Sequence, residues 1–395
     1  MKRMSAKYIF IFAVLFSIAA ITAPKSRAQT FSIVHSFTGG IDGANPLAGF
    51  TIDGLGNLYG TATQGGKFGA GVVLKVNRRG HVIVLYSFQG GADGANPGAS
   101  LFRDAAGSLY GTTADGGTYG AGVVFKVPGK GLETVLYSFK GGADGANPAA
   151  RLVMDPAGNF YGTTTAGGTY SGGAVFKLTP SGQETVLYSF GQGTDGAIPI
   201  AGVTLDGTGN LYGTTSVGGA YGKGTVFQLT PSNPMWTENI LHHFSMGSDG
   251  GILYGGLVFD GSGNLYGAAT DGGDGGENGG GTIFELTPSG GGWTFTVLYV
   301  LPGAGISGSF RDLLVDASGT IYATTHCDGN DRAGTVYKLT HSQGTWTYNL
   351  LYTFTGGNDG LYSFSNLVAD KQGNLYGTTN VGGANGYGVV FKVKP

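Results

Sequence analysis

The sequence predicts an all-β protein, a seven-bladed β-propeller of four-stranded antiparallel blades. One motif, Leu-Tyr-Gly with close variants, occurs seven times at intervals of 51, 51, 51, 54, 56 and 54 residues. A period of this length is typical of propeller blades. Each interval also holds four strand-like segments, and the segments at the two chain ends complement each other. The repeat tyrosines are Tyr59, Tyr110, Tyr161, Tyr212, Tyr266, Tyr322 and Tyr376.

The second repeat shows the four strands clearly. Its segments are rich in β-branched and aromatic residues, which suit a pleated sheet, and turn-forming residues bound each of them. Residues 123–125 are apolar on both faces, as expected for a sheet that packs between two others. No segment has the period of an amphipathic helix, so we expect almost no helix. The predicted strands are 100–104, 109–113, 123–127 and 133–139.

The two chain ends predict how the ring closes. Residues 31–37 resemble the fourth strand of a repeat, whereas residues 389–393 resemble the third. Pairing these two segments removes two exposed sheet edges. We therefore expect one propeller domain over residues 29–395, in which strand 31–37 completes the last blade. Its repeat units begin near residues 46, 98, 149, 200, 254, 308 and 364.

Three motifs carry a family resemblance: LYGTT, GGTYGAGVVFK, and LYSF followed by GGADGANP. Through them residues 31–395 resemble the Gloeo/Verruco-type tandem repeat of exported bacterial proteins, although units five and six depart from it in their loops. The resemblance implies export, often with a C-terminal sorting anchor, and it implies no known reaction. Because Pro395 directly follows a strand, we expect no such anchor here.

The first 28 residues have the pattern of a secretory signal peptide. A basic start precedes a charge-free apolar run over residues 8–23, and Ser26-Arg27-Ala28 offers small residues to a signal peptidase. The run is shorter than the roughly 20 residues of a membrane span. We expect cleavage before Gln29 and a secreted protein, extracellular or periplasmic, with no membrane span in the mature chain.

Composition limits the partners. The predicted signal segment holds five basic residues and no acid, so the rest of the chain has a net charge of about −7. This balance disfavours nucleic acid as a partner. Cys327 is the single cysteine, so no disulfide can form within the chain. We expect a monomer that needs no cofactor, with calcium as the one candidate ion.

The glycine-rich loops predict one functional face. Loops after the second and fourth strands lie on the same side of an antiparallel blade, so both kinds of glycine-rich loop share it. One loop repeats an aromatic residue, and the other repeats an aspartate. Two interpretations stay open: a carbohydrate-binding surface, or aromatics packed between blades and aspartates that cap turns. The residues are Phe68, Tyr119, Tyr170 and Tyr221, and Asp42, Asp93, Asp144, Asp195, Asp249 and Asp359.

His242 and His243 resemble a metal-binding pair. They align, however, with the Tyr-Ser of the other fourth strands, and adjacent strand residues point to opposite faces. We interpret them as structural substitutions, together with His35 at the same tyrosine position.

Unit five adds acidic residues to its glycine-rich loop: Asp271, Asp274 and Glu277. Clustered oxygen ligands suit calcium, although the spacing matches no EF-hand. Unit six carries His326, Cys327, Asp328 and Arg332 in its equivalent loop, a candidate catalytic set in which the thiol needs a base within reach. We attribute the longer spacing of units five and six to these loops, which should lie side by side. The alternative is plain variation of solvated loops.

These observations favour a secreted binding or scaffold module for an extracellular glycan or protein. That interpretation depends on similar shallow sites around the ring and on the expectation that no unique acid–base group lies near the axis. Two alternatives stay open: an extracellular lyase or hydrolase that uses the loops of units five and six, and a purely structural envelope protein. A fold alone cannot choose between them.

Overall fold

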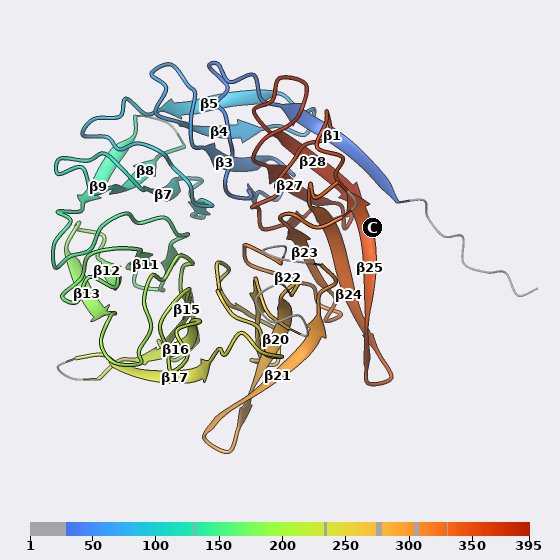
Figure 1. Cartoon of the computed structure of the whole chain (residues 1–395). Helices are drawn as coiled ribbons and strands as arrows, with labels where there is room; N and C mark the ends of the chain where they lie inside the picture. The colour runs from blue at the N-terminus through green and yellow to red at the C-terminus, as the bar shows by residue number, and fades with distance from the viewer. Residues whose placement is uncertain (1–28, 130–131, 233–234, 274–278, 304–307, 330) are drawn as a thin grey trace, which may run out of the picture.

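The computed structural model describes residues 29–129, 132–232, 235–273, 279–303, 308–329 and 331–395, which form a ring of seven blades (Figure 1). Each blade is a four-stranded antiparallel sheet, in which consecutive strands run from the axis to the rim. The predicted fold class is therefore confirmed. The predicted signal peptide lies outside the described residues. In the described part of the chain, no helix is long and apolar enough to span a membrane.

The inner and second strands surround the axis. The inner strands are β2 (Thr51–Ile52), β6 (Phe102–Arg103), β10 (Val153–Met154), β14 (Thr204–Leu205), β18 (Val258–Phe259), β22 (Leu314–Val315) and β26 (Val368–Ala369). The second strands, which hold the repeat tyrosines, are β3 (Leu58–Ala62), β7 (Leu109–Thr113), β11 (Phe160–Thr164), β15 (Leu211–Thr215), β19 (Leu265–Ala269), β23 (Ile321–Thr325) and β27 (Leu375–Thr379).

The third and fourth strands form the outer half of each blade. The third strands are β4 (Val72–Val76), β8 (Val123–Val127), β12 (Ala174–Leu178), β16 (Thr225–Thr230), β20 (Thr282–Ser289), β24 (Thr335–Ser342) and β28 (Val389–Lys394). The fourth strands are β5 (Val82–Ser87), β9 (Thr134–Ser138), β13 (Glu184–Ser189), β17 (Thr237–His243), β21 (Gly292–Val300), β25 (Thr345–Thr353) and β1 (Thr30–Ser36).

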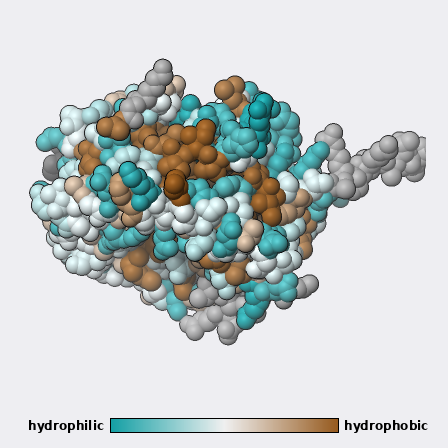
Figure 2. Space-filling view, turned by 90° about the horizontal axis from the view of Figure 1, so that it is seen from above, coloured by the Kyte–Doolittle hydropathy of each residue, from teal (hydrophilic) through white to brown (hydrophobic). Residues whose placement is uncertain are grey.

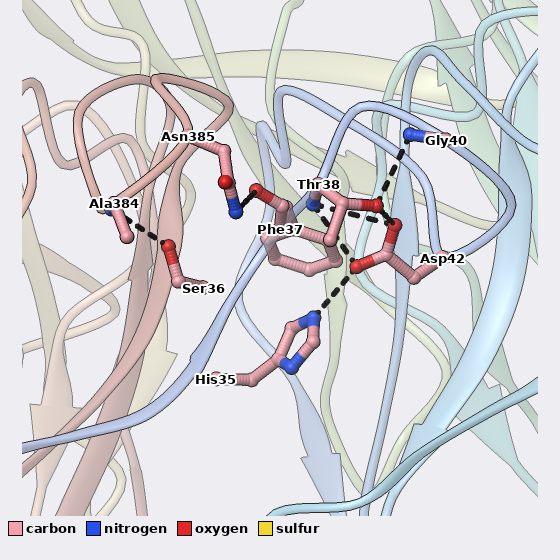
Figure 3. Close-up of polar contacts among 8 residues, drawn as sticks. All are labelled: His35, Ser36, Phe37, Thr38, Gly40, Asp42, Ala384 and Asn385. Carbon is pink, nitrogen blue, oxygen red and sulfur yellow. Dashed lines mark hydrogen bonds and ion pairs between the residues drawn. The ribbon is translucent and has the colours of Figure 1, made fainter.

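Strand β1 closes the ring as predicted. It pairs antiparallel with β28 from Thr30 opposite Lys394 to Ser36 opposite Val389. Side chains reinforce the seam (Figure 3): Ser36 Oγ accepts a hydrogen bond from the Ala384 amide at 2.9 Å, and Asn385 Nδ2 donates to the Phe37 carbonyl at 3.1 Å. The first and last segments of the chain therefore share one blade.

The repeat tyrosine stabilises the turn before its own strand. In unit four, Asp206 Oδ1 accepts a hydrogen bond from the Asn210 amide at 2.9 Å, and Oδ2 accepts one from the Tyr212 hydroxyl at 3.1 Å. Equivalent tyrosine-to-aspartate bonds occur in the other six units. The Asp-x-x-Gly-Asn-Leu-Tyr run is thus a self-capped turn.

The hydrophobic core lies between neighbouring blades. One cluster joins Tyr59 and Val73 of the first blade to Leu101 and Phe125 of the second. In every unit except unit five, the threonine two residues after the repeat tyrosine adds a bond across the interface, as in Thr112 Oγ1 to the Ala150 carbonyl at 3.1 Å. The same bond recurs from Thr61, Thr163, Thr214, Thr324 and Thr378. Adjacent blades are therefore held by both apolar packing and buried hydrogen bonds.

Two expectations about the repeat need correction. The inner strand of unit two is paired only over Phe102 and Arg103, not over five residues, because Asp104 already begins the turn. The extra residues of unit six do not lie in its glycine-rich loop: β24 and β25 have 8 and 9 residues, whereas β8 and β9 have 5 each. The β20–β21 and β24–β25 hairpins of units five and six extend outward beyond the ring (Figure 1).

Candidate functional site

The repeated loop aspartates support the loop structure. Asp93 Oδ2 accepts hydrogen bonds at 2.8 Å from the Tyr86 hydroxyl and from the Gln89 amide. His35 replaces the tyrosine in the closing blade and contacts Asp42 at 2.9 Å (Figure 3), and His242 contacts Asp249 at 3.1 Å. These carboxylates are committed to their own loops, as the turn-capping alternative predicts.

His243 takes the place of the serine that follows the tyrosine. Its Nδ1 accepts a hydrogen bond from the Ala220 amide at 3.3 Å, where Ser138 Oγ accepts one from the Thr118 amide in unit two. Both adjacent histidines therefore have structural partners on different loops.

The four repeated loop aromatics do not pack between blades. Their exposed fractions are 50% for Phe68, 58% for Tyr119, 46% for Tyr170 and 64% for Tyr221. They occur on four consecutive blades, so they form an arc of separate exposed rings on the face of the glycine-rich loops. The arc remains a candidate contact surface.

The calcium candidates are only partly described. Asp274 and Glu277 lie outside the described residues. Asp271 is buried and lies close enough to Tyr254 to help raise the pKa of that phenol, after burial itself. Within the described part of the chain, no three His, Cys, Asp or Glu side chains form a metal-binding group. The calcium site stays a prediction.

The structure separates the side chains of the unit-six loop. The His326 ring turns toward Phe310, Tyr362 and Phe364. Asp328 instead lies near Tyr337 and Tyr348, where its charge helps to raise the pKa of both phenols after burial. Among the described residues, no carboxylate hydrogen-bonds to the His326 ring.

The protonation of this loop also opposes thiol chemistry. Burial lowers the pKa of His326 to about 4. Burial raises the pKa of the Cys327 thiol, and Arg332 only partly opposes this. A reactive cysteine needs a lowered pKa. The loop therefore lacks an activated nucleophile.

His326 belongs to a cluster of aromatic rings near the axis that occurs once in the ring. Tyr254, Phe310 and Phe364 lie twelve residues before the repeat tyrosines of units five, six and seven. Tyr254 stacks on Phe310 with ring centroids 4.7 Å apart, and Phe310 meets Phe364 edge-on at 5.4 Å. His326 and Tyr362 complete this axial aromatic cluster, whose five rings are all partly exposed. The equivalent positions in units one to four are Leu47, Gly98, Ala149 and Ile200.

A polar ring lies next to the cluster, ten residues before each repeat tyrosine. Four of its residues, Arg151, Gly202, Asp312 and Asn366, line two cavities on the axis. Ser100 Oγ donates to Asn366 Oδ1 at 2.7 Å, linking units two and seven. The full axial ring is Gly49, Ser100, Arg151, Gly202, Gly256, Asp312 and Asn366.

Arg311 and Asp312 join the blades around the axis. Arg311 Nε donates to the Phe364 carbonyl at 3.1 Å and Nη2 donates to the Leu47 carbonyl at 3.3 Å, so one guanidinium connects units six, seven and one. Asp312 Oδ1 accepts a hydrogen bond from the Gly256 amide at 2.8 Å. Desolvation lowers the pKa of Arg311, which a nearby Asp312 partly offsets.

Sequence reasoning missed this axial set, because it expected no unique acid–base constellation near the axis. The signal was nevertheless present. Counting ten residues back from each repeat tyrosine finds glycine in three units but arginine in unit three and aspartate in unit six. What the sequence does not display is that these seven positions converge on one axis.

An apolar patch on the edge of the disc is a second surface feature. Figure 2, which views the molecule from the side of β5, shows apolar side chains gathered on this edge. Ile33 of β1, Ile41 of the following loop, and Ile83 and Leu85 of β5 are exposed there by 43%, 73%, 46% and 36%. The patch lies away from the unique residues of units five and six.

A family model, the Gloeobacter/Verrucomicrobia repeat, matches residues 18–219 and 200–395. The chain belongs to this repeat family. The match confirms the resemblance that the three repeat motifs carry. No curated protein matches this Gloeobacter/Verrucomicrobia repeat protein.

Solved structures resemble the repeat protein in fold. An ulvan lyase of polysaccharide lyase family PL25, bound to -[GlcA(1-4)Rha3S]-, is 12% identical with a TM-score of 0.53, covering 89% of this chain and 94% of the lyase. The extracellular domain of a protein named as a hybrid two component system from B. thetaiotaomicron is 12% identical with a TM-score of 0.59. That match covers 92% of this chain but only 39% of the other. At such identities the similarity shows the fold alone.

Proposed function

We propose that this repeat protein is an exported binding module that holds a glycan against the axial aromatic cluster. The observation that carries the proposal is the one-sided distribution of rings around the axis. Units five to seven place Tyr254, Phe310 and Phe364 where units two and three have Gly98 and Ala149. A repeat that only needed to pack would not require this difference.

The chemistry of the cluster suits a sugar. Partly exposed aromatic faces accept the C–H face of a pyranose, and phenol groups such as those of Tyr254 and Tyr362 offer hydrogen bonds at the edge. Binding sites commonly combine apolar rings with a few fixed polar groups. The exposed arc from Phe68 to Tyr221 lies on the same face, so an extended polymer can contact both regions.

A lyase or hydrolase is the alternative, and the protonation of its candidate residues disfavours it. Burial lowers the pKa of His326 to about 4, so the imidazole is a weak base at neutral pH. The Cys327 thiol has a raised pKa. The fold shared with an ulvan lyase does not carry the lyase's activity to this chain.

Export is part of the proposal. The basic start, the apolar run and the small residues before Gln29 support it. N-terminal sequencing of the protein recovered outside the cytoplasm should begin at Gln29. Recovery of a cytoplasmic protein that retains Met1 would contradict export.

A glycan array tests the binding function, and matched variants test its place. We expect Tyr254→Ala to weaken binding of the selected oligosaccharide by about tenfold, or about 1.4 kcal/mol, since the variant loses the apolar area that the ring would bury against the sugar. Ile200→Ala changes the equivalent position of unit four, outside the cluster, and should leave the affinity unchanged. Equal losses in the two variants would place the site elsewhere. Absence of any glycan binding by the wild type would overturn the proposal, and release of shortened products would support the enzyme.

A further inference from the structure

The larger axial cavity has a volume of about 270 Å³ and lies beside the polar ring. Its walls come from the inner strands, which converge on the axis (Figure 1). The residue eight positions before each repeat tyrosine begins every inner strand. These seven residues are Thr51, Phe102, Val153, Thr204, Val258, Leu314 and Val368.

The cavity is lined by apolar side chains of the inner strands and by polar side chains of the axial ring. Val153, Val258, Leu314 and Val368 contribute apolar lining, and only Thr204 interrupts it among the first residues of these inner strands. The polar end is formed by members of the axial ring. The inner-strand side chains can therefore contact the apolar part of a ligand, while the axial ring contacts its charged group.

Arg151 is the cation at the polar end. Its side chain is exposed to the axial cavities, and among the described residues it has neither a hydrogen-bond nor an ion-pair partner. Two other polar side chains there each accept one hydrogen bond. Asp312 accepts from the Gly256 amide, and Asn366 accepts from Ser100. The Arg151 guanidinium is therefore an unpaired cation at this end of the cavity in the described chain.

We propose that the axial cavity binds a small organic monocarboxylate with an apolar body, whose carboxylate pairs with Arg151 and whose body lies against the inner strands. A guanidinium recognises a carboxylate through two parallel hydrogen bonds. The apolar body gains from leaving water against Val258 and Leu314. Asp312 lines the same end and repels a second negative charge, so a dicarboxylate should bind less well. This proposal does not rest on the proposed glycan function, although Tyr254 of the aromatic cluster lines the neighbouring axial cavity.

Titration calorimetry of the purified full chain with 3-phenylpropionate tests the proposal. The neutral analogue 3-phenylpropan-1-ol has the same apolar body. We expect the acid to bind at least about tenfold more tightly than the alcohol, because a hydrogen bond to a charged group contributes more than a neutral one. Equal affinity for the two compounds would overturn the proposal, as would no binding of the acid.

Variants locate the site. Arg151→Gln should reduce the affinity for 3-phenylpropionate about tenfold, and Arg151→Lys should restore part of it. Arg79→Gln removes an exposed cation from the hairpin between β4 and β5 and should have no effect. An Arg151→Gln variant that binds 3-phenylpropionate as tightly as the wild type would contradict the proposal.

Discussion

Tyr362 has a backbone conformation that is unfavourable for an aromatic residue, and its ring packs in the axial aromatic cluster. It has a φ of 61°, in the left-handed region that suits asparagine better than an aromatic residue. Units one to three place Asn45, Asn96 and Asn147 there with φ of 54°, 55° and 54°. The tyrosine ring instead reaches His326 in the axial aromatic cluster, with centroids 4.6 Å apart.

We predict that Tyr362→Asn keeps or slightly raises the melting temperature while it weakens glycan binding. Asparagine relieves a backbone strain of about 1 kcal/mol. It also offers an amide like that of Asn147, which donates to the Ala114 carbonyl at 2.9 Å. Thermal melts and glycan titrations of wild type and variant check this. A melting temperature lowered by several degrees would show that the ring is needed for packing.

Gly111 is a residue whose missing side chain matters. An added Cβ would lie 2.7 Å from the Phe125 ring, closer than real Cβ contacts allow. Unit six has Ala323 at the equivalent position and Tyr337 in place of the phenylalanine, so the pair changes together.

Gly111→Ala should therefore destabilise the fold by about 1–3 kcal/mol, the usual cost of overpacking. Gly91→Ala is the matched control, because an added Cβ there meets nothing within 4 Å. Urea unfolding of both variants decides the matter, and similar midpoints for the two would refute this account of the glycine.

At the scale of elements, each of three neighbouring blade interfaces holds one glutamate carboxyl group that is largely buried. Glu133, Glu184 and Glu238 lie at the start of the fourth strands of units two to four, and burial raises the pKa of each to about 7. Burial is the main cause of the raised pKa, and the negative charge of the loop aspartate of the preceding blade raises the pKa further. In the third of these interfaces, the Tyr188 hydroxyl donates to Glu238 Oε2 at 2.9 Å.

These interfaces should weaken as the pH rises. In the folded state the three carboxyl groups keep their protons up to about pH 7, whereas in the unfolded chain they lose them near 4.5. The folded state thus binds more protons between these values, and its stability falls with rising pH. Because these carboxyl groups are partly exposed and solvent screens their charge, the expected loss of unfolding free energy is about 1 kcal/mol for each group.

The triple variant Glu133→Gln, Glu184→Gln and Glu238→Gln isolates this effect, because glutamine imitates the protonated form. Relative to wild type, it should gain about 3 kcal/mol of unfolding free energy between pH 5 and pH 8. Urea unfolding at both pH values measures the difference. An identical pH dependence in the two proteins would mean that the carboxyl groups are already ionised in the fold.

The sequence predicted most elements because each has a local cause. The strands of unit two alternate with self-capped turns, and the Asp-x-x-Gly-Asn-Leu-Tyr spacing is visible in the chain. The inner strand was predicted too long, since its pairing ends where Asp104 starts a turn. The direction of His326 could not be predicted, because its neighbours Phe310 and Phe364 come from units six and seven at distant sequence positions.

At the scale of the whole molecule, the closed ring creates the site. Positions ten and twelve residues before each tyrosine become neighbours only when seven blades meet at one axis. This explains why the repeat count and closure followed from the sequence, whereas Arg151 and the aromatic cluster did not. Residues that differ between units carry no periodic signal, so their proximity emerges only from the completed fold.

Ring closure should therefore be essential to stability. Deleting residues 29–38 removes β1, leaves the β28 edge unpaired, and removes Phe31, which stacks on Tyr352 at 3.8 Å. We expect a lower melting temperature and aggregation through the open edge. A peptide of residues 29–38 added in trans should restore part of the stability. A truncated protein that stays monomeric with an unchanged melting temperature would refute this role for β1.

The most direct test of the functional account is hydrogen–deuterium exchange with and without the oligosaccharide selected on the array. The account predicts that protection concentrates in residues 252–256, 308–312 and 362–366, which carry the axial rings of units five to seven. Protection confined to the hairpin tips near residues 289–292 and 342–345, or to the apolar patch on β1 and β5, would contradict it.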